Sequence, residues 1–359
     1  MSDVKKKRGR EGMSRRSFIQ STGAIGAATL LGGFPTILRA ASPTVLRITG
    51  WGGLWETVVN TQVYPPFEKE FNCKIEIDQA FPFVPKLLSS SKTKPIYDVF
   101  HCNSNEQWIA LDAGFVEEKV DPKKVPNIND VYSYAVSDKI VGVSVLTSAI
   151  GLGYRTDKVP AAPTSWKDLW DKKYANVRAT YIIGTNSLGS CLFMMAGKVF
   201  GKGLQDTDAA FKAMEELKPI KQVDFSGTME KLLLSGEVQI GVIHDSAIWR
   251  HPTAPVSWAA PKEGVLALEQ VYSVTKGSDK KDLAYAFINY MLSPKIQKIM
   301  VEELWYSPSN KKVTLAPEYA KRLFATDEKV KQLIQVDWKW FNANQDPLTI
   351  RYNKVFQAR

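Results

Sequence analysis

The stretch from residue 138 to residue 170, DKIVGVSVLTSAIGLGYRTDKVPAAPTSWKDLW, constrains the fold more than any other part of the chain. β-Branched and bulky apolar residues occur at strand-like spacing over 140–146 and again over 150–154. A polar connection with prolines follows, and Thr164-Ser165 offers an N-cap for a helix that includes residues 166–170. A long strand followed by a helix, in mid-chain, predicts that the chain crosses here from one lobe into another, with a cleft at the crossing.

A second apolar run, over 265–274, predicts the return crossing. A chain of 359 residues is long enough for two domains with complete cores. We therefore expect a leader over 1–41, a first lobe made of 44–146 and 268–314, and a second lobe made of 147–267 and 315–359.

The leader carries a twin-arginine pattern, Ser-Arg-Arg-Ser-Phe-Ile at 14–19, followed by an apolar Gly/Ala-rich stretch over 24–34 and small residues at 40–42. Residues 1–41 hold eight Lys or Arg and two Asp or Glu, so they supply +6 of the net charge of +10 and leave +4 for the rest. This pattern predicts export to the periplasm by the twin-arginine machinery, and the modest remaining charge gives no reason to expect nucleic-acid binding. An uncleaved anchor and a chance pair of arginines remain open alternatives.

Glycines and short polar residues stand where predicted strands end. The strand over 45–49 runs into Gly-Trp-Gly-Gly at 50–53, the strand over 97–101 stops at Cys-Asn-Ser-Asn, and the turn at 184–190 repeats this arrangement in the second lobe. Such turns bring backbone N–H groups and short side chains to a crevice at the carboxyl ends of the strands. Tight turns and helix caps use the same residues, so a purely structural role is the alternative.

His244-Asp245 ends another apolar strand of the second lobe, over 238–244. A carboxylate at such a place is expensive to desolvate unless a cation or hydrogen-bond donors meet it. The ammonium group of a ligand would meet this need, and helix capping by Asp245 is the competing interpretation.

The segment GLGYRTDKVPAAPTSWKDLWDKKY, after an apolar crossover strand, resembles the periplasmic spermidine/putrescine-binding group of ABC-transporter receptors, within the class of type II solute-binding proteins. The resemblance runs over most of the chain after residue 44. It implies an α/β, two-lobed type II periplasmic binding protein fold, in which each lobe is a mixed, mainly parallel sheet flanked by helices and two crossover strands form the hinge.

The same resemblance implies positions for the ligand contacts. The aromatic residues of the family's first turn fall near Trp51 and Trp55, its late tyrosine at Tyr306, and its return-crossover tryptophan and aspartate at Ala267 and Glu269. Several cation-binding residues of the family are replaced in this chain. The position of the family's second-lobe tryptophan is occupied by His244, and the positions of its second-lobe carboxylates fall near Asn186 and Gly189. The predicted ligand-binding residues are Trp51, Gly52, Gly53, Trp55, Asn103, Asn105, Asn186, Ser187, His244, Asp245, Glu269 and Tyr306.

The resemblance implies a non-catalytic receptor that captures a solute between its lobes and delivers it to the permease of an ABC importer, and the residue inventory predicts that this solute is small and amine-bearing or zwitterionic. One or two acids cannot neutralise the three ammonium groups of spermidine, so a diamine or an amino-acid-like zwitterion fits better. We expect a monomer without a cofactor, and no metal, because the three histidines and three cysteines lie far apart in the sequence.

Two alternatives differ in function class. An enzyme on the same scaffold, of thiaminase-like type, would use a cysteine in the cleft as nucleophile, and Cys102 stands at a strand end where one could act. Its neighbour His101 should point to the opposite face of the strand, so no acid–base partner is evident. An exported sensor that docks on a signalling partner is the third possibility.

Overall fold

Residues 43–184 and 187–357 are described in a computed structural model of the chain. The predicted signal peptide at 1–41 and the candidate residue Asn186 lie outside these ranges. Within the described ranges eleven strands form one sheet. Its main path runs in the order β2 (Cys73–Asp78), β1 (Thr44–Thr49), β3 (Val99–Cys102), β9 (Val265–Val274), β4 (Val143–Arg155), β7 (Ile240–His244), β5 (Arg178–Tyr181) and β6 (Lys221–Val223). Three short strands attach beside this path: β8 (Val256–Ala259) and β10 (Ser307–Pro308) pair with β4, and β11 (Leu333–Ile334) pairs with β9.

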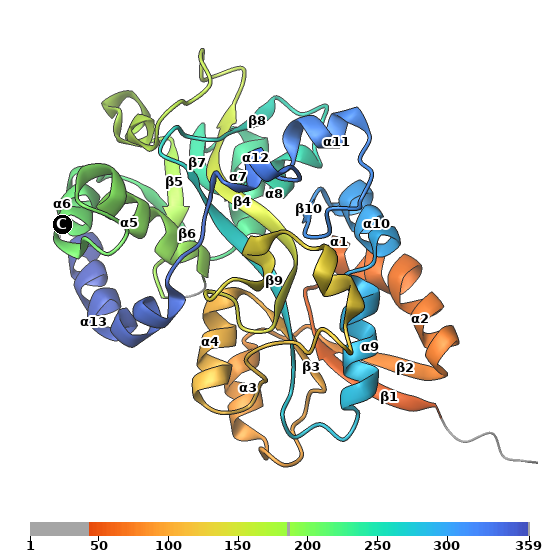
Figure 1. Cartoon of the computed structure of the whole chain (residues 1–359). Helices are drawn as coiled ribbons and strands as arrows, with labels where there is room; N and C mark the ends of the chain where they lie inside the picture. The colour runs from red at the N-terminus through yellow and green to blue at the C-terminus, as the bar shows by residue number, and fades with distance from the viewer. Residues whose placement is uncertain (1–42, 185–186, 358–359) are drawn as a thin grey trace, which may run out of the picture. The chain divides into compact units, whose positions relative to one another are not determined.

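Two long antiparallel strands, β4 and β9, run through both halves of this sheet (Figure 1). They pair from Val143 with Tyr272 to Ile150 with Leu266. One end of β9 pairs with β3 of the first lobe, whereas the far end of β4 pairs with β7 of the second. Every residue of both strands is buried, which explains their nearly continuous apolar sequence. The apolar runs predicted over 140–146 and 150–154 therefore belong to a single strand, β4, which begins at Val143. The crossings predicted for this strand and for the run over 265–274 are both confirmed.

The first lobe places helices around β1, β2 and β3, which are parallel to one another (Figure 1). A continuous helical stretch follows β1: α1 (Leu54–Val58), a π-helical turn (Val59–Val63) and α2 (Tyr64–Phe71). The other elements are α3 (Phe83–Ser89), α4 (Ser104–Asp112), 3₁₀ turns at Pro126–Asp130 and Ser133–Val136, α9 (Lys281–Met291) and α10 (Pro294–Leu304). Ser293 caps α10 and Pro294 opens it, as the Ser-Pro sequence predicts.

The second lobe is built on β7, β5 and β6. Its helices are α5 (Ser187–Phe200), α6 (Thr207–Glu216), α7 (Ser226–Ser235) and α8 (Asp245–Trp249). After the crossing, Ser165 caps the predicted helix at Trp166–Trp170, which is a short 3₁₀ helix, and another 3₁₀ turn follows at Lys172–Tyr174. The capping box of Ser165 with Asp168 and the burial of Trp166 are both present.

The C-terminal segment comprises α11 (Pro317–Arg322), α12 (Asp327–Val330), β11 and α13 (Trp338–Gln357). Helix α13 contacts both lobes: Asn342 Nδ2 donates to Asn105 O at 2.8 Å in the first, and Lys218 Nζ of the second lobe donates to Val355 O at 2.8 Å. The lobe boundaries drawn from the sequence stay predictions. None of the helices within the described ranges combines the length and apolar character that a membrane span requires.

Candidate functional site

A cavity of about 670 Å³, hereafter the cleft, opens where strand ends of both lobes meet. The first lobe contributes the turn after β1, Phe81, Asn103, two residues of β9 and the end of α10. The second lobe contributes the first residues of α5 and α7, the end of β7 and the residues after α8. The full lining is Trp51, Gly52, Gly53, Leu54, Trp55, Phe81, Asn103, Ser187, Leu188, Phe225, Ser226, Gly227, Glu230, His244, Arg250, His251, Leu268, Gln270, Leu304 and Tyr306.

The structure brings together most of the predicted ligand-binding residues, whether they were predicted from strand ends or, like Trp55 and Tyr306, from the family resemblance. Those that line the cleft are Trp51, Gly52, Gly53, Trp55, Asn103, Ser187, His244 and Tyr306. The two lobes approach each other here, since Ser187 Oγ donates to Asn103 Oδ1 at 3.4 Å. The rule that ligands gather at the carboxyl ends of strands therefore located this cavity.

Glu269 lies on the wrong face of β9 for a contact in the cleft. Its neighbours Leu268 and Gln270 line the cleft, and successive side chains of a strand point to opposite faces. The Glu269 carboxylate is buried behind them, where it accepts from Ser104 Oγ at 3.0 Å and from Gln335 Nε2 at 3.1 Å. The prediction that Glu269 contacts the ligand was therefore wrong, because a shift of one residue along a strand places the side chain on the opposite face of the sheet.

Asp245 and Asn105 are also absent from the lining of the cleft. Asp245 is completely buried at the start of α8, and its Oδ1 accepts from the backbone N–H groups of Ala149 on β4 and of Ser246, at 2.9 and 2.8 Å. The expected ammonium contact of Asp245 is therefore misplaced, and the alternative of helix capping is not observed either, because Asp245 is the first residue of α8 and the N-cap is His244. Asn105 faces α13 through its backbone carbonyl.

The burial of Asp245 predicts a pH-dependent stability. Desolvation raises the pKa of this carboxyl to about 7, although backbone N–H groups of Ala149 and Ser246 oppose the shift. An unfolded Asp titrates near pH 4, so between about pH 4 and pH 7 the folded state binds more protons, and the free energy of unfolding falls as pH rises. Asp245→Asn should flatten part of this slope and raise the melting temperature at pH 8. Melting curves at pH 5, 6, 7 and 8 measure it, and wild-type and variant slopes that run parallel would contradict the assignment.

Sequence reasoning missed three polar residues of the second-lobe wall, Glu230, Arg250 and His251. Arg250 Nε donates to Glu230 Oε1 at 3.1 Å, Arg250 Nη2 contacts Glu230 Oε2, and His251 Nε2 contacts Glu230 Oε1. Burial alone would raise the pKa of Glu230, but these hydrogen bonds hold it below its ordinary value. The acid is thus already neutralised by Arg250. No local motif marks these residues, because they meet only when α7 packs against the end of α8.

Aromatic rings form much of the first-lobe wall. Trp55 stacks on His101 with ring centroids 5.1 Å apart. Tyr306 makes an edge-to-face contact with Trp55, with ring centroids 5.5 Å apart. Trp51 lies 6.4 Å from Phe81, which in turn meets Phe225 of the second lobe at 6.5 Å. Because the face of an aromatic ring attracts cations, this wall suits an ammonium group and its alkyl chain.

The second-lobe wall also exposes the start of a helix. Helix α7 begins with Ser226 and Gly227, and its N-cap residue Phe225 provides no capping hydrogen bond from its side chain. A Cβ added at Gly227 would meet nothing within 4 Å, so the backbone is accessible there. Free N–H groups at a helix start favour an oxyanion.

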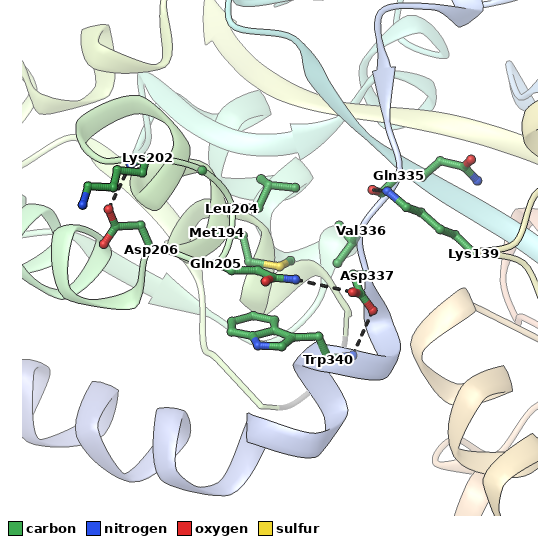
Figure 2. Close-up of a pocket in the computed structure, with 11 residues that line it drawn as sticks. Lys139, Met194, Lys202, Leu204, Gln205, Asp206, Gln335, Val336, Asp337 and Trp340 are labelled. Atoms are coloured by element: carbon green, nitrogen blue, oxygen red, sulfur yellow. Dashed lines mark hydrogen bonds between the residues drawn. The ribbon is translucent and has the colours of Figure 1, made fainter.

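A second cavity of about 650 Å³, hereafter the rear cavity, is lined by Lys139, Met194, residues 202–206, residues 335–337 and Trp340. Figure 2 shows the indole of Trp340 and the carboxylate of Asp337 there; Asp337 accepts from Gln205 Nε2 and from Trp340 N, at 3.4 and 2.9 Å. Gln335, which borders it, also reaches Glu269. The starts of α6 and α13 border the rear cavity, but the Asp206 side chain accepts from Ala209 N and the Asp337 side chain accepts from Trp340 N, whereas Phe225, the N-cap residue of α7, makes no such side-chain bond. We therefore assign the ligand to the cleft.

Two lobes that share two long strands and enclose a cleft at their strand ends define a type II periplasmic binding protein. Residues 62–326 match the family model of the bacterial extracellular solute-binding proteins, and the chain belongs to this family. Residues 12–32 match the signal sequence of the twin-arginine translocation pathway. The protein is therefore a periplasmic component of an ABC importer, exported by the twin-arginine machinery.

Relatives confirm the resemblance found in the sequence. A Salmonella typhi protein with the provisional name 2-aminoethylphosphonate-binding periplasmic protein is 23% identical over 283 residues, which cover 77% of this chain and 80% of that one. The spermidine/putrescine-binding periplasmic protein of Escherichia coli is 24% identical over 231 residues, covering 60% and 65%. The crystal structure of an ABC transporter from Clostridium perfringens is 27% identical with a TM-score of 0.74, and the match covers 86% of this chain and 99% of that one.

Within 43–184 and 187–357, no group of three or more His, Cys, Asp or Glu side chains is placed to hold a metal ion. The three cysteines are free and buried.

Proposed function

We propose that the protein captures a small zwitterion carrying one amine and one oxyanion, such as an ω-amino acid or an aminoalkylphosphonate, for delivery to the permease. The charge inventory of the cleft carries this proposal. Among the described residues that line the cleft, Glu230 is the one acid, and Arg250 already neutralises it. Arg250 binds Glu230 through Nε and Nη2, so its Nη1, the start of α7 and the aromatic faces remain for the ligand, and they suit an oxyanion and a single ammonium group.

A polyamine fits this inventory poorly. Each ammonium group removed from water needs a carboxylate or several acceptors, and an unpaired buried cation is costly. The two acids expected from the sequence, Asp245 and Glu269, lie outside the lining of the cleft. Of the ligands named for the two relatives, 2-aminoethylphosphonate therefore supports the proposal better than spermidine or putrescine does.

Calorimetry and thermal shift on the exported protein test the proposal. The panel is 2-aminoethylphosphonate, 4-aminobutyrate, putrescine and spermidine, which separates amines with an oxyanion from amines without one. A ligand at a hundred times its Kd stabilises the folded state by about 2.7 kcal/mol, so a zwitterion should raise the melting temperature clearly. Binding of putrescine and spermidine without binding of either zwitterion would overturn the proposal.

We also propose that the protein acts as a monomeric receptor without catalysis. Cys102, the candidate nucleophile, is completely buried and does not line the cleft. Burial, with the nearby Glu106, raises the pKa of this thiol well above its ordinary value, whereas a nucleophilic thiolate needs a lowered one.

Iodoacetamide should therefore leave Cys102 unmodified in the native protein and alkylate it only after unfolding. Peptide mass spectrometry measures the modification. Rapid alkylation of the native protein, slowed by ligand, would support the enzyme alternative instead. Cys191, equally buried on α5, is an internal control for burial alone.

A further inference from the structure

Gln270 is held on the floor of the cleft by two hydrogen-bond donors that meet at one atom. Trp51 Nε1 donates to Gln270 Oε1 at 2.5 Å, and His101 Nε2 lies 3.2 Å from the same atom. An indole N–H can only donate, so the amide atom that it contacts must be the oxygen. The orientation of the amide is thereby fixed, with its NH₂ group on the other side.

His101 is fixed as firmly as the amide that it contacts. It is 1% exposed and lies between the rings of Trp55, at 5.1 Å, and Tyr272, at 4.2 Å with an angle of 11° between the ring planes. Burial lowers the pKa of His101 to about 3, so the imidazole is neutral at physiological pH. In this neutral ring the proton lies on Nε2, which donates to Gln270 Oε1, and Nδ1 is unprotonated. This tautomer agrees with the lack of a hydrogen-bond partner for Nδ1 in the described part of the chain.

We infer that Gln270 is a specificity-determining residue, held by Trp51 and His101 so that its amide N–H groups donate to the oxyanion of the ligand. His101 is a positioning residue, because it acts through Gln270. No hydrogen bond from Gln270 Nε2 occurs within residues 43–184 and 187–357, and Gln270 lines the cleft. The inference rests on the proposed function and assigns one end of its ligand.

The fixed amide selects against diamines as well as for oxyanions. A carboxylate or phosphonate accepts the N–H groups of Gln270, whereas the ammonium groups of a diamine offer no acceptor. Closing the cleft on a diamine would desolvate these donors without a partner, and an unpaired buried donor costs binding free energy. Discrimination between the two ligand classes is thus built into a residue that carries no charge.

Gln270→Glu tests the inference on the full exported protein. A glutamate oxygen still accepts from Trp51 and His101, but the side chain presents no N–H group and adds a negative charge. The Kd for 2-aminoethylphosphonate should rise by about thirtyfold or more, since a hydrogen bond to a charged group is lost and repulsion is added. The affinity for putrescine should rise, so the preference between the two ligands inverts. Gln205→Glu, at the rear cavity, is the matched control and should change neither affinity.

His101→Phe tests the positioning role. Phenylalanine keeps the ring between Trp55 and Tyr272 but removes the N–H donor, so the amide of Gln270 is free to turn. The Kd for 2-aminoethylphosphonate should rise by about three- to tenfold, the range expected for one neutral hydrogen bond, while the Kd for putrescine does not rise. A merely structural defect would weaken both ligands alike.

Calorimetry with both ligands separates the possible failures. A wild-type protein that binds no zwitterion contradicts the proposed function. A wild-type protein that binds 2-aminoethylphosphonate, with Gln270→Glu showing the same ratio of the two Kd values, overturns the role of Gln270 and leaves the proposed function standing. Should His101→Phe fail to fold, Gln270→Glu alone decides.

Discussion

Arg250→Ala is expected to cause the largest loss of ligand affinity of any single change in the cleft. The substitution removes the cation that faces the cleft and leaves the partly buried Glu230 with His251 as its remaining partner. A zwitterion would then lose charge-assisted hydrogen bonds to its oxyanion and meet an uncompensated carboxylate. The expected cost is about 2–4 kcal/mol, or roughly thirtyfold to a thousandfold in Kd by calorimetry.

Two comparisons show whether the guanidinium itself matters. Arg250→Lys keeps the charge but not the two-pronged contact with Glu230, so it should fall between wild type and alanine. Arg351→Ala breaks an exposed ion pair with Asp208 and should leave the Kd unchanged. An unaltered Kd in Arg250→Ala would show that the oxyanion does not rest on the second-lobe wall.

Trp166→Ala is expected to cause a large loss of stability. Trp166 follows the long crossing strand, its side chain is completely buried, and its Nε1 donates to Gly264 O at 2.8 Å, beside the start of β9. Truncating a buried tryptophan costs about 3–5 kcal/mol through lost burial and the cavity left behind. With an unfolding entropy of roughly 2.1 cal/mol/K per residue, the melting temperature should fall by about 6 °C.

Ile350→Ala, at an exposed position of α13, is the control and should shift the melting temperature little. Scanning calorimetry measures both variants without ligand. A Trp166→Ala protein that melts with wild type would mean that this turn does not hold the two crossing strands in place.

Much of the fold was predictable because its strongest signals are local. Buried strands such as β4 and β9 require apolar side chains on both faces, and this requirement leaves long apolar runs in the sequence. Strand ends followed by glycine or by short polar residues located Trp51, Asn103 and Ser187, since strands of one sheet present those ends to a common crevice.

The parts that were missed depend on register and on packing between distant segments. Glu269 and Gln270 differ by one position, and only the observed pairing of β9 shows which side chain faces the cleft. Glu230 lies on α7, and Arg250 lies 20 residues later, directly after α8. Asp245 stands at a strand end as predicted, but backbone donors already fill its Oδ1, so its position alone was misleading.

Hydrogen exchange measured with and without 2-aminoethylphosphonate tests the central claim most directly, namely that both walls of the cleft hold one ligand. We expect the ligand to slow exchange in the turn at 50–55 and at the start of α7, residues 225–230, at the same concentration, with no change around the rear cavity at 202–206 and 335–340. Protection of one wall alone, or protection centred on the rear cavity, would contradict this account.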